Sequence, residues 1–364
     1  MKLVLLGDGE SPHLLKWARA LAPRLELYAA SSRSFAPALA ELLPAERRLA
    51  LDTHPSFAGG NAAVLRSLPR LARWLRQVQP DWVHAHYLTS HGTLAWLARA
   101  LWRLPVRIAG SAWGSDILVT PQRSWLMRML TRRVLRACSL CTSDSLHMAE
   151  RMRVLGAGEV MSFPFGLEAL PDAPGSKSAT LFFANRGLEP IYAPQRVLAV
   201  FERIAQDWPQ AELVLANDGS LRSALERQVA QGPLAQRVRF VGRLDATAQA
   251  RWYRDARWYL SLPLSDSVSV SVLEALAHGC IPLLSDLPAN HELVTSGRNG
   301  LVLTDGQAPG ASALQPLADR APQIAADNHA WVARHAMFEP AVDRFVARLH
   351  ALQSGAARRG GALA

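Results

Sequence analysis

The sequence predicts an α/β protein with two parallel-sheet domains that face each other across a cleft. Three observations support this prediction: a length of 364 residues, a composition of 49% hydrophobic and 19% charged residues, and an alternation of strand-like and helical segments that occurs twice. Because a single hydrophobic core stops growing near ~250–300 residues, this length favours two domains. The composition excludes a disordered, collagen-like or disulfide-scaffold protein.

Residues 1–167 are expected to form the first domain. Short apolar runs predict strands, and segments with apolar residues at three- and four-residue spacing predict helices. The expected strands include residues 2–7, 25–31, 81–87, 139–145 and 160–167, and the expected helices are residues 11–24, 65–79, 93–104 and 124–137. Strands that alternate with helices need crossover connections, which produce a parallel sheet.

The pattern restarts after residues 168–179, a stretch rich in Pro, Gly, Ser and Ala that we interpret as the interdomain linker. Residues 180–322 then form the expected second domain. Its strands are predicted at residues 180–186, 211–218, 238–244, 257–264, 281–286 and 300–305, and its helices at residues 194–208, 221–231, 247–256 and 269–279. A helical segment is expected over residues 323–353 and a disordered tail over 354–364. Paired α/β domains of this kind bind ligands at the carboxyl ends of their strands.

The net positive charge of the chain comes from the first domain. Residues 1–167 contain 21 Lys or Arg and 11 Asp or Glu, whereas the rest of the chain is balanced. Five arginines share the helix predicted over residues 124–137 or its approach: Arg123, Arg128, Arg132, Arg133 and Arg136. This pattern favours an anionic partner, and our hypothesis is a lipid-linked or membrane-located acceptor. The alternative is that the helix packs its apolar stripe on the sheet and leaves the arginines in water.

No segment is predicted to cross a membrane. The first apolar run, residues 3–6, is too short for a signal peptide, and the longest uncharged run, residues 82–98, is shorter than the ~20 residues of a membrane helix. The three cysteines include Cys138 and Cys141, a CxxC pair without a second pair to complete a zinc site. We interpret both as core residues of a reduced, cytoplasmic protein, with any membrane contact peripheral on the inner face.

The segment 261–279 contains the most informative spacing. An apolar strand is followed by small and acidic residues, and a helix is predicted from about Val268 to Gly279. The N–H groups at the start of this helix form the positive end of its dipole, which suits a diphosphate. Asp266 lies at the start and Glu274 eight residues later, where a carboxylate can accept hydrogen bonds from the hydroxyls of a ribose. The alternative is that Asp266 only caps the helix and that Glu274 is solvated.

These residues resemble the E-x7-E signature of retaining glycosyltransferase family 4, which has the GT-B fold, with Asp266 as the first acid. The resemblance continues through residues 273–294 and extends to residues 214–244, 81–92 and 111–118. It implies transfer of a sugar from a nucleotide-diphosphate donor, UDP- or GDP-linked, with retention of configuration and without a metal or other cofactor. The implied acceptor is a glycan or a lipid-linked molecule of bacterial polysaccharide or glycolipid synthesis.

The resemblance also assigns roles to particular residues. Glu274 is the implied ribose-binding acid, Asp266 the acid beside the donor sugar, and Arg186 the arginine that contacts the diphosphate. The implied backbone cradle for the phosphates is Ser267, Val268, Ser269 and Val270. Arg243 and Leu244 match the place where the base binds, and Gly9, in the turn of residues 7–9, matches the loop that reaches the donor phosphates or the acceptor.

Two positions depart from the family pattern. The lysine expected five or six residues after the arginine is missing, because Ile191 and Tyr192 stand there; Arg186 or Arg196 would then balance the phosphate charge. The histidine usually found near the reacting sugar aligns with Trp113. An indole N–H or a stacking face is the expected contribution of that residue, and its neighbour Asp116 is expected to bind a hydroxyl.

His13 and His86 are the candidate residues on the acceptor side. We expect His84 and His86 to point to opposite faces of their strand, so that at most one of them faces the cleft, and His86 lies nearer the carboxyl end. Core packing is the role that we favour for each of these two histidines, and His86 is the better candidate for a role in the cleft.

Other classes of protein are also weighed against the sequence. A sugar-nucleotide epimerase or hydrolase on the same fold would turn over the donor without an acceptor. A nucleic-acid-binding protein is compatible with the charge and the eleven tryptophans, but no recognition module is present, so we expect no nucleic-acid partner. A dehydrogenase is disfavoured because the glycine turn of residues 7–9 lacks the third glycine of GxGxxG. No Asp-x-Asp sequence offers a metal clamp, so arginine and a helix start are expected to meet the leaving-group charge.

Overall fold

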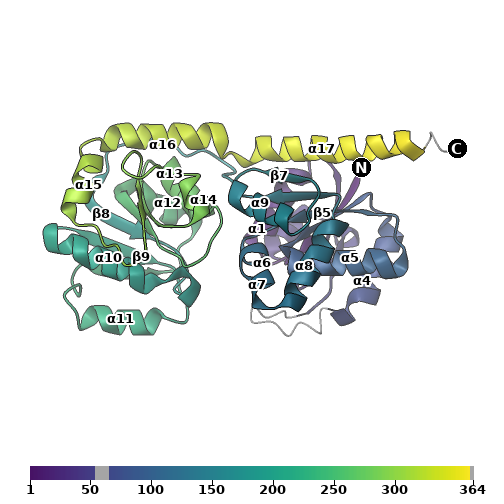
Figure 1. Cartoon of the computed structure of the whole chain (residues 1–364), viewed down its shortest axis with the longest axis horizontal. Helices are drawn as coiled ribbons and strands as arrows, with labels where there is room; N and C mark the ends of the chain where they lie inside the picture. Colours follow the sequence, from purple (N-terminus) through teal and green to yellow (C-terminus); the bar gives the residue numbers. More distant parts are fainter. Residues whose placement is uncertain (54–64, 361–364) are drawn as a thin grey trace. The chain divides into compact units, whose positions relative to one another are not determined.

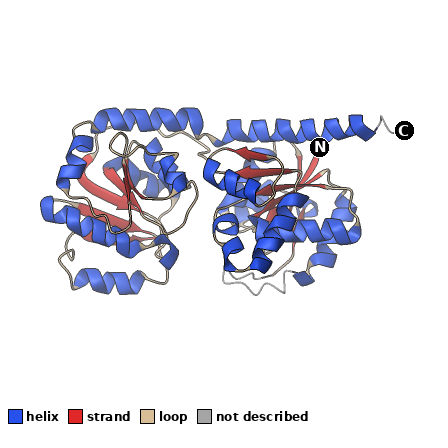
Figure 2. Ribbon diagram, viewed as in Figure 1, coloured by secondary structure: helices blue, strands red, loops and turns tan. Residues whose placement is uncertain are grey.

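The computed structural model describes residues 1–53 and 65–360. The chain divides into two compact units, of which the first contains Met1–Phe163 and the chain from Phe338 onward, and the second contains Pro164–Met337 (Figure 1). Each unit is built on one parallel sheet with helices between its strands, as the sequence predicted (Figure 2). Within the described ranges, no helix is long and apolar enough to cross a membrane.

The first unit contains a seven-stranded sheet with the order β3-β2-β1-β4-β5-β6-β7. Its strands are β1 (Lys2–Gly7), β2 (Glu26–Ser31), β3 (Arg48–Ala50), β4 (Trp82–His86), β5 (Arg107–Ser111), β6 (Leu140–Ser143) and β7 (Val160–Ser162). Neighbouring strands pair in parallel, with Leu5 opposite both Ala29 and His84. The order turns back on itself at β1 and β4, and ligand sites of α/β sheets lie beyond the carboxyl ends of strands at such a point.

Helices connect these strands on both faces of the sheet. They are α1 (Pro12–Leu21), α2 (Pro37–Leu42), α4 (Leu68–Val78), α5 (Thr93–Trp102), α6 (Ser115–Leu118), α7 (Thr120–Arg123), α8 (Trp125–Ala137), α9 (Leu146–Val154) and, from the end of the chain, α17 (Phe338–Gly360). Ser124 and Ser145 cap α8 and α9 by accepting hydrogen bonds from backbone N–H groups three residues later. A π-helical turn, η2 (Tyr87–Gly92), follows β4 directly.

The second unit contains a six-stranded parallel sheet with the order β10-β9-β8-β11-β12-β13. The strands are β8 (Ser178–Ala184), β9 (Glu212–Ala216), β10 (Val238–Gly242), β11 (Ala256–Ser261), β12 (Ile281–Ser285) and β13 (Leu301–Leu303). The helices are α10 (Pro194–Asp207), α11 (Arg222–Ala230), α12 (Ala246–Asp255), α13 (Val270–Ala277), α14 (Pro288–His291), α15 (Ala311–Ala318) and α16 (Ala321–His335). Here β8 and β11 are the central pair where the order reverses.

Side chains of β8 alternate between two apolar cores. Phe182 packs with α10 and α11 on one face, whereas the next residue, Phe183, packs with α12 and α13 on the other. Both phenylalanines are fully buried. This alternation explains the continuous apolar run of the strand, since a sheet covered by helices on both faces needs apolar residues in both directions. It also positions α12 and α13 on the same side of the sheet.

Helix α17 belongs to the first unit, although it follows the second unit in sequence. Its Phe338 and Phe345 contact the buried ring of Trp17 on α1 at centroid distances of 5.1 and 5.3 Å. At the surface, Arg24 pairs with Glu339 and Asp343, and Arg348 pairs with Glu159. The apolar contacts account for most of this docking, because exposed ion pairs contribute little.

The boundaries differ from the sequence-based expectation. The chain enters the second unit after Phe163, four residues before the expected boundary, because the N–H of Leu167 already bonds to Ala336 O at 2.8 Å. The expected linker, residues 168–179, includes the first residues of β8, and Lys177 within it donates three hydrogen bonds to carbonyls at the end of α12 and the start of β11. The expected helical segment 323–353 is two helices that belong to different units.

The expected disordered tail is also partly helical. Helix α17 continues from Ser354 to Gly360, because alanine and arginine favour extension of a helix that is already anchored. Residues 361–364 lie outside the described residues. Cys138 and Cys141 are buried free cysteines in the core of the first unit, which confirms their interpretation as core residues.

Candidate functional site

Polar side chains and backbone donors gather at the start of α13. The helix begins at Val270, two residues later than expected, because Ser267 and Val268 still belong to the turn that follows β11. The carboxylate of Asp266 shapes this turn by accepting the N–H of Ser267 at 3.0 Å. Within residues 1–53 and 65–360, the N–H groups of Val268, Ser269 and Val270 have no hydrogen-bond partner. These donors at the positive end of the helix dipole suit an anion.

Arg186 connects the end of β8 to this turn. Its guanidinium pairs with Asp266 at 2.5 Å, donates to Ser271 Oγ at 3.2 Å and also donates to Ser269 Oγ. The ring of Tyr192 lies 4.5 Å from the guanidinium carbon. Tyr192 stands where the family pattern has a lysine, so an aromatic face, and not a second cation, accompanies the arginine here.

The arginine and the acid are both largely buried, with exposed side-chain fractions of 19% and 22%. Burial raises the pKa of Asp266, and the positive charge of Arg186 opposes this rise. The Nε of Arg186 is buried without a hydrogen-bond partner in the described structure. The site therefore keeps a cationic donor group whose hydrogen-bonding capacity the protein does not exhaust.

Glu274 lies about one turn further along α13 and is held by two side chains of α12. Its Oε2 accepts hydrogen bonds from Tyr253 Oη at 3.0 Å and from Gln249 Nε2 at 3.2 Å. The structure therefore brings Arg186, Asp266, the 267–270 turn and Glu274 together in one unit. Tyr253 and Gln249 are contacts that the sequence analysis missed, since the helix pattern of residues 247–256 shows a buried tyrosine but not the acid that it meets.

Three further residues of the second unit are candidates for donor binding, Arg243, Leu244 and Arg196. Arg243 follows β10 and is exposed, whereas Leu244 packs against the apolar core around α12 and α13. Arg196, the alternative partner for phosphate charge, pairs with Asp305 at 2.8 Å and makes no ion pair with Asp266. Arg186 is thus the arginine that contacts the start of α13.

Gly9 of the first unit lies in a closely packed turn after β1. Its N–H donates to Ser31 Oγ at 2.8 Å, and a Cβ atom at this position would come within 2.5 Å of Ser34 O and 2.7 Å of the Phe35 ring. Only glycine allows this close approach of the chain after β2. The turn leads into α1, where Ser11 caps the helix and His13 follows.

Trp113 and Asp116 lie beyond the carboxyl end of β5. The two carboxylate oxygens of Asp116 accept the backbone N–H groups of Trp113 at 2.9 Å and Leu88 at 2.8 Å. Asp116 is 1% exposed, and burial raises its pKa to about 6, although these backbone donors oppose the rise. The acid therefore joins the loop after β5 to the turn after β4.

The indole of Trp113 donates its N–H to His86 Nδ1 at 3.2 Å. Its ring also contacts His13 at a centroid distance of 4.5 Å and stacks on Tyr87 at 5.9 Å. Tyr87 adopts a φ of 63°, which is strained for an aromatic residue and is typical of functional sites. His13, His86, Trp113 and Asp116 thus form one cluster at the carboxyl ends of β4 and β5.

The expectation that His84 and His86 point to opposite faces is wrong. Side chains alternate with every residue of a strand, so residues two apart lie on the same face. Their rings are 4.4 Å apart, and both contact Trp17 under α17. Burial lowers the pKa of His84 to about 3 and that of His86 well below its ordinary value, so both are neutral.

Two family models match the chain. One, described as glycosyl transferase 4-like, covers residues 2–145, and the other, described as glycosyl transferases group 1, covers residues 178–319. Each match falls within one unit: the first contains β1 to β6 but not β7, and the second begins at β8 and contains all six strands of its sheet. The candidate clusters of both units fall within the matched segments.

Curated relatives are similar over part of the chain. A D-inositol 3-phosphate glycosyltransferase of Catenulispora acidiphila is 29% identical over 68% of this chain and 64% of its own length. A phosphatidyl-myo-inositol mannosyltransferase of Mycolicibacterium smegmatis is 27% identical over 45% of this chain and 43% of its own length. The chain thus spans less than two thirds of the length of either relative.

Solved structures show the same fold over almost the whole chain. The Anabaena protein Alr3699/HepE in complex with UDP superimposes with a TM-score of 0.75 at 16% identity and covers 96% of this chain and all of its own. Sucrose-phosphate synthase from Thermosynechococcus elongatus superimposes with a TM-score of 0.74 at 15% identity and covers both chains completely.

Proposed function

Because the chain belongs to the family 4 glycosyltransferases of the GT-B fold, we propose that it transfers a sugar from a nucleotide-diphosphate donor to a hydroxyl group of a glycan or a lipid-linked acceptor. One observation carries this proposal: Arg186 contacts Asp266, Ser269 and Ser271 at the start of α13, and Glu274 follows on the same helix. A cation and unpaired N–H groups suit the diphosphate, and a carboxylate suits the ribose.

The donor binds with its diphosphate at the start of α13 and its ribose at Glu274. Arg186 and the helix dipole stabilise the charge that develops on the departing nucleoside diphosphate, without a metal ion. The acceptor oxygen attacks the anomeric carbon on the side from which the diphosphate leaves, so the configuration is retained, and a phosphate oxygen takes the acceptor proton. Similar structures solved with UDP and UDP-glucose support a UDP-linked donor.

Trp113 and His13 form the proposed acceptor side of the reaction. Since the indole N–H of Trp113 is already bonded to His86, we assign the ring face, and not the N–H, to the sugar. Aromatic faces pack well against the apolar C–H faces of sugar rings, because contact removes both apolar surfaces from water. The relatives named for inositol phosphate and phosphatidylinositol support an acceptor with a polyhydroxylated ring.

The test is nucleotide binding followed by product analysis. Calorimetric titration with UDP, GDP and ADP identifies the base, and Glu274→Gln should weaken binding about tenfold to a hundredfold because a charged hydrogen-bond acceptor is lost. Glu212→Gln is the matched control. This exposed acid is the first residue of β9, whereas the proposed site lies beyond the carboxyl ends of the strands. Unchanged affinity in Glu274→Gln would contradict the assignment.

Product analysis separates this function from its alternative. A transferase releases nucleoside diphosphate in proportion to the glycosylated acceptor. An epimerase or hydrolase on the same fold turns over the sugar nucleotide equally well without any acceptor, and that result would replace the proposed reaction.

We further propose that the first unit meets an anionic membrane surface through α8. Trp125, Leu126 and Met129 in the first turns of this helix are 75%, 49% and 43% exposed, while only its second half is buried against the unit. The apolar stripe therefore does not pack on the sheet at this end. Exposed apolar side chains beside cations are typical of helices that bind at a membrane interface.

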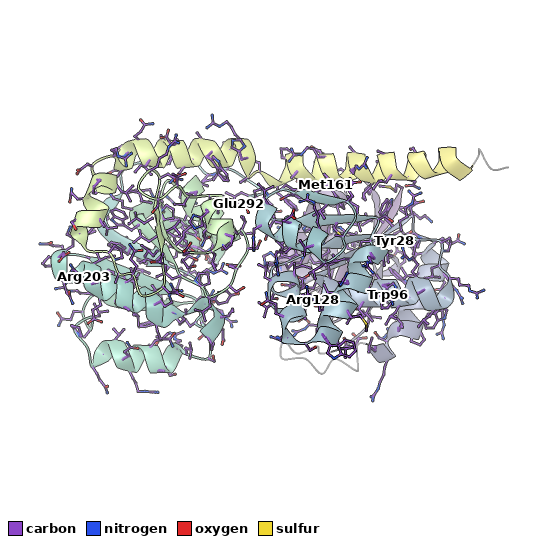
Figure 3. All side chains as sticks on the ribbon, in the orientation of Figure 1. Tyr28, Trp96, Arg128, Met161, Arg203 and Glu292 are labelled. Carbon is purple, nitrogen blue, oxygen red and sulfur yellow. The ribbon has the colours of Figure 1, made fainter. Side chains whose placement is uncertain are left out.

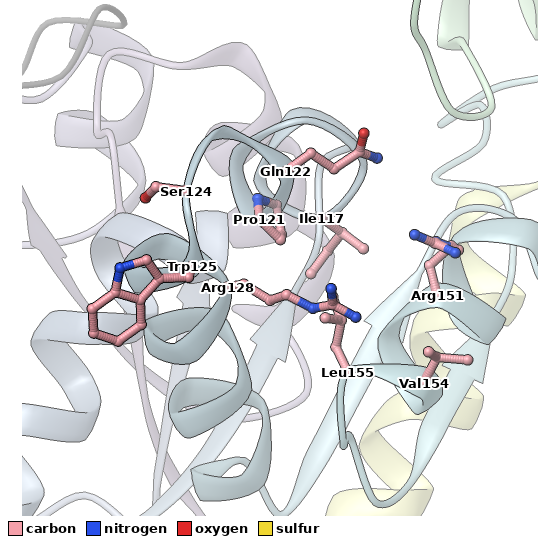
Figure 4. A pocket seen from close by; sticks show the side chains of 9 residues that line it. All are labelled: Ile117, Pro121, Gln122, Ser124, Trp125, Arg128, Arg151, Val154 and Leu155. Carbon is pink, nitrogen blue, oxygen red and sulfur yellow. The ribbon is translucent and has the colours of Figure 1, made fainter.

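The charge around α8 supports the same partner. Residues 117–143 contain five arginines and no acid, and all five arginines are exposed. None of them forms an ion pair or side-chain hydrogen bond within the described part of the chain. A groove of about 410 Å³ beside α8 places Arg128 and Arg151 next to the apolar side chains of Ile117 and Leu155 (Figure 4). Such a groove suits a lipid headgroup with a negative charge.

A further inference from the structure

A row of buried polar side chains leads through the core of the second unit to Glu274. Tyr259 Oη donates to Asn185 Oδ1 at 2.7 Å, Asn185 Nδ2 donates to Tyr253 Oη at 2.7 Å, and Tyr253 Oη donates to Glu274 Oε2 at 3.0 Å. Tyr259, Asn185 and Tyr253 are 0%, 6% and 1% exposed. Three elements, β11, the end of β8 and α12, thus contribute one side chain each.

The amide of Asn185 gives this row a direction. Its Oδ1 can only accept and its Nδ2 can only donate, so Tyr253 Oη accepts from the amide and its single proton points onward. That proton reaches Glu274 Oε2 at 3.0 Å or the neighbouring carbonyl of Ser271 at 3.1 Å. Burial raises the pKa of Tyr253 well above its ordinary value and that of Tyr259 to about 12, so both phenols keep their protons. The donors of Tyr259 and Asn185 therefore point along the row toward Tyr253, whose proton points to α13 at Glu274 or Ser271.

We infer that Asn185 and Tyr253 are positioning residues for Glu274, which hold its carboxylate in the orientation that a ribose needs. This inference rests on the proposed role of Glu274 as the ribose-binding acid. A carboxylate on a flexible glutamate side chain loses rotational freedom when it binds a ligand, and hydrogen bonds that already fix it reduce this cost.

The geometry of α12 supports the inference. Gln249 and Tyr253 are four residues apart, so both project from one face of the helix, and both donate to the same oxygen of Glu274. The end of α12 is held in turn, because Lys177 Nζ donates to the carbonyls of Tyr253, Arg254 and Ala256 at 2.7, 3.0 and 3.0 Å. Both donors to Glu274 therefore come from an element that is anchored at its far end.

The end of β8 connects both acids of the site. Asn185 leads through Tyr253 to Glu274, and the next residue, Arg186, contacts Asp266. The Asn185 backbone is itself fixed, since its carbonyl accepts from Asn217 Nδ2 at 3.2 Å. Two adjacent residues thus set the relative positions of the acid assigned to the ribose and the acid assigned to the sugar.

The test is a double-mutant cycle on nucleotide affinity in the full chain. Tyr253→Phe should raise the dissociation constant of the nucleoside diphosphate about threefold to tenfold, because one hydrogen bond to a charged group is lost. In the Glu274→Ala background, the same change should alter the constant by less than about twofold, since the group that it positions is absent. The donor KM should rise with the dissociation constant while kcat stays unchanged.

Two further variants keep the result interpretable. Gln249→Ala removes the second donor from a half-buried position, where folding is not at risk, and should behave like Tyr253→Phe in both backgrounds. Tyr28→Phe is the matched control, because Tyr28 also donates to a carboxylate, Glu26 Oε1 at 2.9 Å, but lies in the first unit (Figure 3). It should leave nucleotide affinity unchanged.

The outcomes separate this inference from the proposed function. If the unmodified protein binds no nucleotide, the proposed function and this inference both fail. If Glu274→Ala weakens binding but Tyr253→Phe and Gln249→Ala do not, only the inference is overturned. Equal weakening by Tyr253→Phe with and without Glu274 also overturns it, because the tyrosine would then act through packing alone.

Discussion

The guanidinium of Arg186 lies 2.5 Å from the carboxylate of Asp266 and contacts two serines at the start of α13 as well. A planar group with five donors can serve these partners at once, whereas an ammonium ion presents a point charge. The pair connects the ends of β8 and β11, the two central strands of the second sheet.

Arg186→Lys is therefore expected to weaken nucleoside diphosphate binding about tenfold, although the charge is kept, because the fork of hydrogen bonds is lost. Isothermal titration measures this change. Arg227→Lys, on an exposed position of α11, is the control for the same substitution elsewhere in the unit. Equal affinities for Arg186→Lys and the unmodified protein would remove Arg186 from the phosphate site.

Trp113→Phe is expected to keep sugar transfer within about threefold, because the ring face remains and the lost N–H was already bonded to His86. It should lower the free energy of unfolding by about 1 kcal/mol, the typical cost of a lost hydrogen bond. Trp113→Ala, in contrast, should abolish most transfer. Steady-state kinetics and urea unfolding measure both effects, and a Phe variant as inactive as the Ala variant would assign the N–H to the substrate.

The full chain is expected to float with vesicles that contain phosphatidylglycerol and not with vesicles of phosphatidylcholine alone. Arg128→Glu should reduce this binding on the order of tenfold, since one cation near an anionic surface contributes about 1 kcal/mol and its reversal more. Trp125→Ala should also reduce binding, because the exposed indole no longer inserts.

Two controls belong to the vesicle experiment. Arg227→Glu makes the same charge change on the second unit, and Leu101→Ser removes an apolar side chain that is 64% exposed on α5. Both should bind vesicles like the unmodified protein. Binding of anionic and neutral vesicles to the same extent would contradict the proposal, and oligonucleotide binding lost in Arg128→Glu would assign the surface to nucleic acid instead.

Stability is expected to fall as the pH falls below ~6.5. Burial lowers the pKa of His84 to about 3, that of His91 to about 4 and that of His86 well below its ordinary value. These histidines stay neutral in the folded chain but take up protons on unfolding, so each lowers the free energy of unfolding by ~1.4 kcal/mol per pH unit until its folded pKa is reached.

Asp116 has the opposite effect on the pH dependence of stability. Burial raises its pKa to about 6, so the folded chain takes up a proton there while the unfolded chain does not, until the pH approaches ~4. We expect a net loss on the order of 1–3 kcal/mol per pH unit between pH 6 and 4. Urea unfolding at several pH values measures this slope. His84→Leu should reduce the dependence of the unfolding free energy on pH. An unchanged slope in this variant would contradict the lowered pKa of His84 in the folded chain.

Much of the fold could be predicted because its signals are local. Apolar runs and three- and four-residue periodicity identified the strands and most helices, and the doubled pattern indicated two sheets. The boundaries between the two units could not be predicted from the sequence, because the packing of Phe338 and Phe345 on Trp17 joins residues that are more than 300 positions apart. No local signal distinguishes a helix that returns to the first unit from one that ends the second.

The sequence by itself determined the two parallel sheets and pointed to the acid pair Asp266 and Glu274, because these depend on periodicity and on the spacing of residue types, whereas Arg186 was singled out by the family resemblance. Only the tertiary structure decided which partners these groups meet: Tyr253 and Gln249 at Glu274, Tyr192 at Arg186, and His86 at Trp113. The physical reason is that a hydrogen bond depends on distance and direction in space, and parallel strands bring their carboxyl ends together from remote parts of the chain.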